Sequence, residues 1–241
     1  MKRPRLYRDL AAWWPLLSPP EDYRDEAAWI LETLTHALGR RPATILDLGS
    51  GGGNTASFLA PHAALTLVDL SPEMLAVGRR LLPNAAHAEG DMRSVRLGRV
   101  FDAVLMHDAV MYLTTEADLV AALATARAHL AEGAVIALPD CVAETFAPGI
   151  ETGGADAPGG RGARFLAWTH APAPGATAYD VDYAFLLRAP GGAVEMVHDR
   201  HRCGLFARAA WRRAFRAAGF AAPERRVDPW KREVFVARPA R

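Results

Sequence analysis

Residues 45–54, Ile-Leu-Asp-Leu-Gly-Ser-Gly-Gly-Gly-Asn, decide how this chain folds. An apolar run of strand-forming residues ends at Asp47, and the alternating glycines Gly49, Gly51 and Gly53 follow at once. A helical pattern then begins at Asn54. Glycine carries no Cβ and tolerates positive φ, so a strand–turn–helix unit of this kind lets the backbone approach a bulky cofactor closely.

The glycine spacing excludes two common nucleotide sites. It is G-x-G-x-G, whereas a dinucleotide pyrophosphate is held by G-x-G-x-x-G at a helix N-terminus. The Lys-Ser/Thr pair of a phosphate-binding P-loop is also missing after the turn.

A second acid completes the pattern. The apolar run 65–68 ends at Asp69, roughly twenty residues beyond the glycines, where a second parallel strand should end beside the first. A carboxylate at this place can accept hydrogen bonds from both hydroxyls of a ribose. The sequence therefore predicts a nucleoside-containing cofactor.

These two segments resemble the class I S-adenosylmethionine (SAM)-dependent methyltransferases. Residues 47–53 look like the family's cofactor loop, and residues 68–75 look like its acidic loop. The resemblance covers residues 40–140 strongly. It implies an α/β fold with a doubly wound, mostly parallel, Rossmann-like sheet of seven strands. The alternative is a glycine-rich turn in another α/β protein.

The resemblance also implies which residues bind SAM. Asp91 would lie near the adenine amino group, with Met92 against the ring. The full predicted cofactor set is Tyr23, Asp47, Gly49, Ser50, Gly51, Gly53, Asp69, Leu70, Met74, Asp91, Met92 and His107.

Helical and strand patterns alternate through most of the chain. A helix is predicted from Tyr23 to Gly39, and family members often fold such a helix over the cofactor. Further helices are expected after Ser71, from Thr114 or Thr115 to Gly133, and before Gly219. Strands are expected at 85–88, 101–106, 134–138, 220–227 and 233–237.

Residues 139–204 interrupt this alternation. A flexible Gly/Pro-rich piece, 148–162, precedes strand-like runs near 164–170, 178–188 and 193–203. Tyr179, Tyr183 and Phe185 fall on one face of the middle run. This pattern predicts an antiparallel β insertion after strand five, and small-molecule methyltransferases often place such a flap over the acceptor. The same aromatic residues could instead pack on the main sheet.

We divide the chain into an N-terminal helical cap (1–40), a SAM-binding core (41–140), an antiparallel insertion covering the acceptor pocket (141–204) and closing elements of the core (205–241). Residues 6–7, 21–23 and 201–206 look like bacterial small-molecule N-methyltransferases that act on amino sugars or glycine. The predicted acceptor-binding residues are Tyr7, Tyr112, Tyr179, Tyr183 and Phe185.

Candidate bases are His107, Asp108 and His201. A neutral amine needs little more than the loss of its proton to complete the transfer, whereas a hydroxyl needs a base. We favour His201 for contact with the acceptor and assign His107 and Asp108 to the rim between cofactor and acceptor. No metal site is expected, because His198 and the set of Asp199, His201 and Cys203 would point to opposite faces of a strand.

Composition narrows the remaining possibilities. The formal net charge of +1 gives no overall field for nucleic acid or a membrane, and two cysteines give no disulfide framework. We therefore expect a cytoplasmic enzyme with a small-molecule acceptor and no nucleic-acid or membrane partner, and we consider a homodimer as its assembly. The alternatives are a SAM-binding protein without transferase activity and, less favoured, a nucleic-acid methyltransferase.

Overall fold

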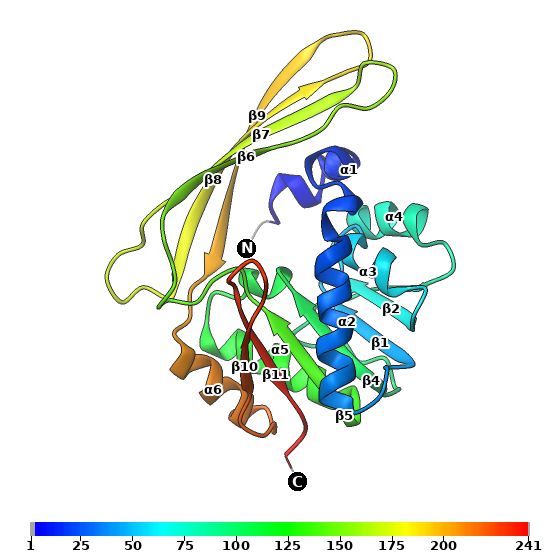
Figure 1. Ribbon diagram of the computed structural model, residues 1–241. Helices are drawn as coiled ribbons and strands as arrows, with labels where there is room; N and C mark the ends of the chain where they lie inside the picture. Colours follow the sequence, from blue (N-terminus) through cyan, green and yellow to red (C-terminus); the bar gives the residue numbers. More distant parts are fainter. Residues whose placement is uncertain (1–2, 241) are drawn as a thin grey trace.

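The computed structural model describes residues 3–240, so residues 1–2 and 241, at the outer ends of the first and last predicted segments, lie outside it. Its body is a seven-stranded sheet in the order β10-β11-β5-β4-β1-β2-β3 (Figure 1). Neighbours from β3 to β5 pair in parallel, whereas β11 pairs antiparallel with β5 and β10. The predicted doubly wound, mostly parallel sheet is confirmed. Its strands are β1 Thr44–Leu48, β2 Ala64–Asp69, β3 Ala86–Glu89, β4 Phe101–His107, β5 Leu130–Leu138, β10 Glu224–Val227 and β11 Glu233–Ala237.

Helices cover both faces of this sheet. Successive strand side chains point to opposite faces, so Ile45 packs in the cluster of one layer and Leu46 in that of the other. Helices α2 (Arg24–Leu38) and α3 (Asn54–Leu59) pack on the first face, and α5 (Glu116–Ala128) and α6 (Arg208–Ala217) pack on the second. Helix α4 (Pro72–Leu81) follows β2, with Ser71 as its N-cap.

The N-terminal part divides in two. Helix α2 buries Ile30 and Leu34 against the sheet and ends at Gly39, whose φ of 71° allows the chain to turn away. This helix is thus a layer of the core, which differs from the expectation that it covers the cofactor. The short helices before it, η1 (Arg5–Tyr7), η2 (Ala11–Trp13), α1 (Trp14–Leu17) and η3 (Pro20–Tyr23), form the cap instead.

The helix end predicted at Gly133 is wrong. We predict it as the end of a helix, but α5 ends at Ala128 and Gly133 lies within β5. The register of β4 and β5 shifts between Phe101 and Ala103, and a Cβ at Gly133 would lie 2.2 Å from the carbonyl oxygen of Asp102. The glycine is therefore needed for close strand contact, because any side chain would push the two backbones apart.

A separate antiparallel sheet, in the order β6-β7-β8-β9, projects from the core (Figure 1). Strands β7 (Gly162–Thr169), β8 (Ala178–Arg188) and β9 (Val194–Gly204) match the three predicted runs. Strand β6 (Gly149–Gly153) is a correction, because it lies in the segment we expected to be flexible. Strand β6 is an exposed edge strand, so its own sequence carries no apolar pattern. It is extended because it pairs with β7.

No helix within residues 3–240 is long and apolar enough to cross a membrane.

Candidate active site

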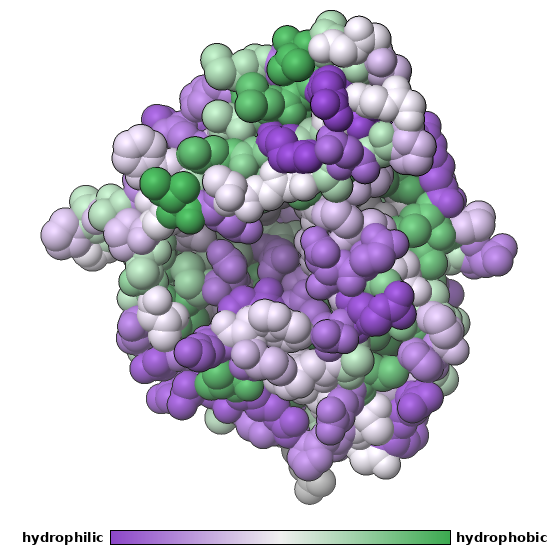
Figure 2. Space-filling model, turned by 45° about the horizontal axis from the view of Figure 1, so that its top comes forward, coloured by the Kyte–Doolittle hydropathy of each residue, from purple (hydrophilic) through white to green (hydrophobic). Residues whose placement is uncertain are grey.

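A cavity of about 720 Å³ opens at the carboxyl ends of β1, β2 and β4. Figure 2 shows this side of the molecule hollowed at its centre among hydrophilic side chains. Ligands of open α/β sheets bind at this edge of the sheet. The predicted site residues that line the cavity are Tyr7, Tyr23, Asp47, Gly49, Ser50, Gly51, Asp69, Leu70, Asp91, Met92, His107, Asp108 and Tyr112.

The glycine turn forms the floor of the cavity. Gly49, Gly51 and Gly53 have φ angles of 88°, 54° and 81°, which side-chain-bearing residues rarely adopt. A Cβ at Gly49 would lie only 2.3 Å from the Cβ of Ala109. Gly53 faces away from the cavity, and Met74 is fully buried beneath the turn. These two predicted cofactor residues therefore support the turn from behind.

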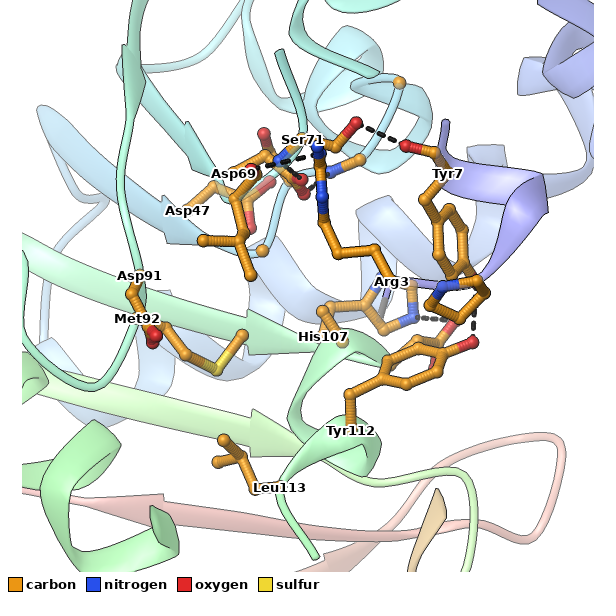
Figure 3. Close-up of a pocket in the computed structure, with 18 of the residues that line it drawn as sticks. Arg3, Tyr7, Asp47, Asp69, Ser71, Asp91, Met92, His107, Tyr112 and Leu113 are labelled. Atoms are coloured by element: carbon orange, nitrogen blue, oxygen red, sulfur yellow. Dashed lines mark hydrogen bonds and ion pairs between the residues drawn. The ribbon is translucent and has the colours of Figure 1, made fainter. Parts of the chain in front are cut away.

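Asp69 is held rigidly at the end of β2. One carboxylate oxygen accepts from the backbone N–H of Gly51 at 2.8 Å, and the other accepts from that of Ser71 at 2.8 Å (Figure 3). Burial raises the pKa of Asp69, although these two donors oppose the rise. Each oxygen keeps a lone pair for a ligand.

The surroundings of Asp47 indicate whether SAM fits this cavity. Its side chain is 4% exposed, and its Oδ1 has no hydrogen-bond partner among the described residues. Burial raises the pKa of Asp47 to about 7, with His107 opposing the rise. A buried carboxylate oxygen without a donor is costly unless a ligand supplies one. The α-ammonium group of SAM would supply it, so the residues present fit this cofactor.

His107 lies at the end of β4 within a network of charges. Its Nε2 is 3.1 Å from a Glu26 oxygen and 3.2 Å from an Asp108 oxygen, and Arg232 pairs with Glu26. Burial lowers the pKa of His107, but Asp108 and Glu26 outweigh it and raise the pKa to about 9. His107 is therefore a cation at neutral pH. Asp108 itself has a φ of 48°, a strained conformation of the kind found at functional sites.

The N-terminal cap is attached to the cofactor loops. The Trp14 indole N–H donates to Asn54 at 3.3 Å, and the Asn54 amide donates to the Ser18 carbonyl at 2.8 Å. Arg3 forms an ion pair with Glu73 at 3.0 Å, and the Ser71 hydroxyl donates to the Tyr7 carbonyl. The cap thus forms a roof whose position depends on the same loops that line the floor.

The opposite end of the cavity is built from three distant parts of the chain. The hydroxyl groups of Tyr7 and Tyr112 lie 2.8 Å apart (Figure 3), and the Tyr112 hydroxyl lies 2.8 Å from Nδ1 of His201. His201 is 1% exposed and does not line the cavity. The predicted direct contact between His201 and an acceptor is therefore not supported, because Tyr112 stands between them.

The aromatic side chains of β8 fill the core instead of the cavity. Phe185 is in a buried cluster with Leu6 and Leu10 from the cap, and Tyr179 is in a second buried cluster with Met111 and Leu205. The Tyr183 ring packs on His201, with ring centroids 4.5 Å apart. Direct contact of these three residues with an acceptor is a prediction that their placement does not support.

Sequence reasoning missed several residues on the cavity. Arg3 and Trp14 line it from the cap, and Asp180, Arg200 and Arg202 line it from β8 and β9. The alternation of charged residues with His201 and Cys203 on β9 was the available signal for the arginines.

Within residues 3–240, no group of three His, Cys, Asp or Glu side chains is placed to hold a metal ion.

Comparison with known proteins identifies the family. Residues 45–133 match the family described as "Methyltransferase domain". A dTDP-3-amino-3,6-dideoxy-alpha-D-glucopyranose N,N-dimethyltransferase of Streptomyces fradiae is 34% identical over 91% of this chain and 86% of its own length. The chain belongs to the class I SAM-dependent methyltransferases. This methyltransferase uses SAM to methylate a nitrogen or oxygen of a small polar metabolite.

Solved structures agree with this assignment. DesVI of Streptomyces venezuelae superimposes with a TM-score of 0.82 at 32% identity, covering 91% of this chain and 92% of DesVI. The sugar N-methyltransferase KedS8 of Streptoalloteichus superimposes with a TM-score of 0.82 at 25% identity, covering all of this chain and 95% of KedS8. Both the core and the antiparallel insertion thus have counterparts in these enzymes.

Proposed function

We propose that this methyltransferase acts on the amino nitrogen of a nucleotide-linked amino sugar. The observation that carries the proposal is the composition of the cavity lining, which includes the paired hydroxyls of Tyr7 and Tyr112 as well as Arg200 and Arg202. Hydroxyl oxygens can accept from an amine, and arginines bind phosphate oxygens. The relatives that match nearly the whole chain carry amino-sugar N,N-dimethyltransferase names, which supports the same substrate class.

The cofactor end has a complementary set of groups. In this proposal Asp69 accepts from the ribose hydroxyls, Asp47 accepts from the α-ammonium group, and cationic His107 attracts the carboxylate of the methionine part. Tyr23, Leu70 and Met92 supply apolar surface, and Asp91 lies at the adenine end. When bound, SAM supplies an electrophilic methyl group on a sulfonium.

The two arginines suit a diphosphate. Arg202 pairs with Asp180 at 3.0 Å, and Arg200 pairs with Asp182 at 2.6 Å, and both arginines are more than half exposed. Exposed ion pairs are worth only about 0–1 kcal/mol, so a dianionic ligand can compete with these carboxylates for the guanidinium groups.

The protein's main contribution to catalysis is positioning. Holding an acceptor in line with the methyl group can contribute roughly 7–11 kcal/mol. His107 does not serve as a base at neutral pH, because its pKa of about 9 keeps it protonated. An amine acceptor needs only a group that takes one proton from its nitrogen. The tyrosine hydroxyls can take part in that proton transfer.

The decisive experiment incubates the protein with SAM and dTDP-3-amino-3,6-dideoxyglucose and measures the product mass. We expect addition of one or two methyl groups, with no reaction of the matched 3-hydroxy sugar. SAM binding by calorimetry without any methylated product from a panel of dTDP-amino sugars would refute this substrate class. Such a result would point to a different small polar acceptor.

The assembly and location of the enzyme stay part of this proposal. A homodimer would have a surface available on the exposed face of the antiparallel sheet, where six large apolar side chains are exposed to solvent. A cytoplasmic location suits an enzyme that draws on the SAM pool. The six exposed apolar side chains are Ile150, Leu166, Trp168, Leu186, Val194 and Met196.

A further inference from the structure

Four side chains form a continuous hydrogen-bond chain from the cavity into the interior. Tyr7 Oη lies 2.8 Å from Tyr112 Oη, which lies 2.8 Å from Nδ1 of His201. Nε2 of His201 lies 3.1 Å from Oδ2 of Asp199, which also accepts from the backbone N–H of Leu6 at 2.9 Å. Tyr7 and Tyr112 line the cavity, whereas His201 and Asp199 are buried.

Asp199 fixes the direction of every hydrogen bond in this chain. Burial raises the pKa of Asp199, but His201 and the Leu6 N–H outweigh it and bring the pKa below its ordinary value, so the group is a carboxylate that can only accept. Nε2 of a neutral His201 must then carry the proton, and Nδ1 must accept from Tyr112. The Tyr112 oxygen in turn accepts from Tyr7, so the Tyr7 oxygen presents a lone pair to the cavity.

We propose that Asp199 orients this chain so that it takes the proton from the ammonium group of the acceptor, an inference that rests on the amine acceptor proposed above. Tyr7 accepts the ammonium proton and passes its own proton to Tyr112, and Tyr112 passes its own to Nδ1 of His201. The result is a neutral amine in the cavity and an imidazolium paired with the Asp199 carboxylate. The nitrogen lone pair then forms the N–C bond while the methyl–sulfur bond breaks toward sulfur.

The surroundings of the chain are suited to this transfer. Burial raises the pKa values of Tyr7 and Tyr112 well above their ordinary range, so neither tyrosine holds a negative charge and the proton must move on to His201. The groups that face His201 are the rings of Tyr7, Tyr112 and Tyr183, together with Asp199. Arg5, whose charge interacts with that of Asp199, is engaged by Asp9 at 2.6 Å. Asp199 is therefore the one carboxylate in direct contact with His201 among the described residues.

In this scheme Tyr7 touches the acceptor, and His201 and Asp199 are positioning residues that act through Tyr112. The test variant is Asp199→Asn, because its amide oxygen can still accept from Leu6 and from Nε2 while the charge is lost. We expect kcat at pH 7 to fall at least ten-fold, with the affinity for SAM and the melting temperature nearly unchanged. The loss should shrink as the pH is raised toward ~9, because the acceptor amine then binds already neutral.

A double-mutant cycle separates this role from a structural one. If Asp199 acts through Tyr112, adding Asp199→Asn to Tyr112→Phe should cause no further loss of kcat, because the chain is already cut. His198→Gln is the matched control for His201→Gln, since His198 lies on the same strand with its side chain 66% exposed. A loss from Asp199→Asn that persists in the Tyr112→Phe background, or that is the same at every pH, would overturn the proposal.

The ¹⁵N chemical shifts of His201 test the chain without any acceptor. The chain requires the Nε2–H tautomer in the free enzyme near pH 8, with the signals assigned by comparison with His201→Gln. The Nδ1–H tautomer there would overturn the proposed direction of the hydrogen bonds. If the wild-type enzyme methylates no amino sugar but shows the Nε2–H tautomer, the substrate class fails while the orientation by Asp199 stands.

Discussion

The two ends of the cavity are constructed in different ways. The floor of the cofactor end uses backbone groups and side chains from two short segments, 47–52 and 69–71, that follow the adjacent strands β1 and β2. The acceptor end that we propose joins Tyr7, Tyr112 and Arg202, which come from the cap, the core and the insertion. A contiguous site tolerates little change at any position, whereas a composite site can change its ligand when one of its parts changes.

The largest effect is expected from a side chain placed in the floor of the cofactor end. In Gly49→Val the new Cβ would meet Ala109 at 2.3 Å and Met92 at 2.8 Å, so SAM affinity should fall roughly 100-fold or more. Gly98→Val is the matched control, because Gly98 also has a positive φ (67°) but no atom lies within 4 Å of its Cβ position. Calorimetry showing equal SAM affinity in both variants would contradict the close fit of the turn.

Removal of the Asp69 carboxylate should have the next largest effect. Hydrogen bonds to a charged group contribute about 1.5–3 kcal/mol, so Asp69→Ala should weaken SAM binding by roughly one to two powers of ten. The KM of the acceptor should not change, because Asp69 lies at the other end of the cavity. Asp25→Ala, at an exposed position on α2, controls for the loss of one negative charge. A parallel change in acceptor KM would mean that the two ends are coupled.

The same contrast decides what could be predicted from the sequence. The glycine turn and Asp69 follow from local patterns, because a strand, a turn and a helix in sequence fix one another's positions, whereas the seven-stranded sheet is implied by the resemblance to the methyltransferases. The Tyr7–Tyr112–His201 contact joins residues 105 and 89 positions apart in the chain, and no local pattern encodes it. His201 and Tyr183 could be assigned to the same face of a sheet by the period of two. Only packing decided that this face meets the cap and not the acceptor.

The stability of the folded protein should depend on pH through the charge of His107. Its pKa is raised from 6.5 to about 9, so its stabilising contribution is complete below pH ~6.5 and is lost as the pH rises through about 9. The difference in free energy of unfolding between wild type and His107→Gln should therefore shrink from pH 6.5 to pH 10. Denaturant titrations across this range measure it, with His36→Gln at an exposed position as the control. A difference that does not vary with pH would mean that His107 is not a cation in the folded protein.

The smallest expected effect comes from the rim of the acceptor end. Arg202→Gln removes one of two neighbouring guanidinium groups, and a phosphate contact at an exposed site is worth about 0.5–1.5 kcal/mol. The KM of dTDP-3-amino-3,6-dideoxyglucose should therefore rise only about two- to ten-fold, with SAM affinity and kcat unchanged. Salt should reduce the difference between wild type and variant, because it screens exposed charges.

Arg212→Gln, at an exposed position on α6 away from the cavity, is the matched control for the loss of a positive charge. The sharper measurement replaces the substrate with the same amino sugar lacking the nucleotide. If Arg202 binds the diphosphate, wild type and Arg202→Gln should methylate the free sugar equally well, because the free sugar lacks the diphosphate. A KM effect that persists with the free sugar would assign Arg202 to the sugar itself. The acceptor end would then recognise its ligand without the nucleotide, and the composite site would be smaller than proposed.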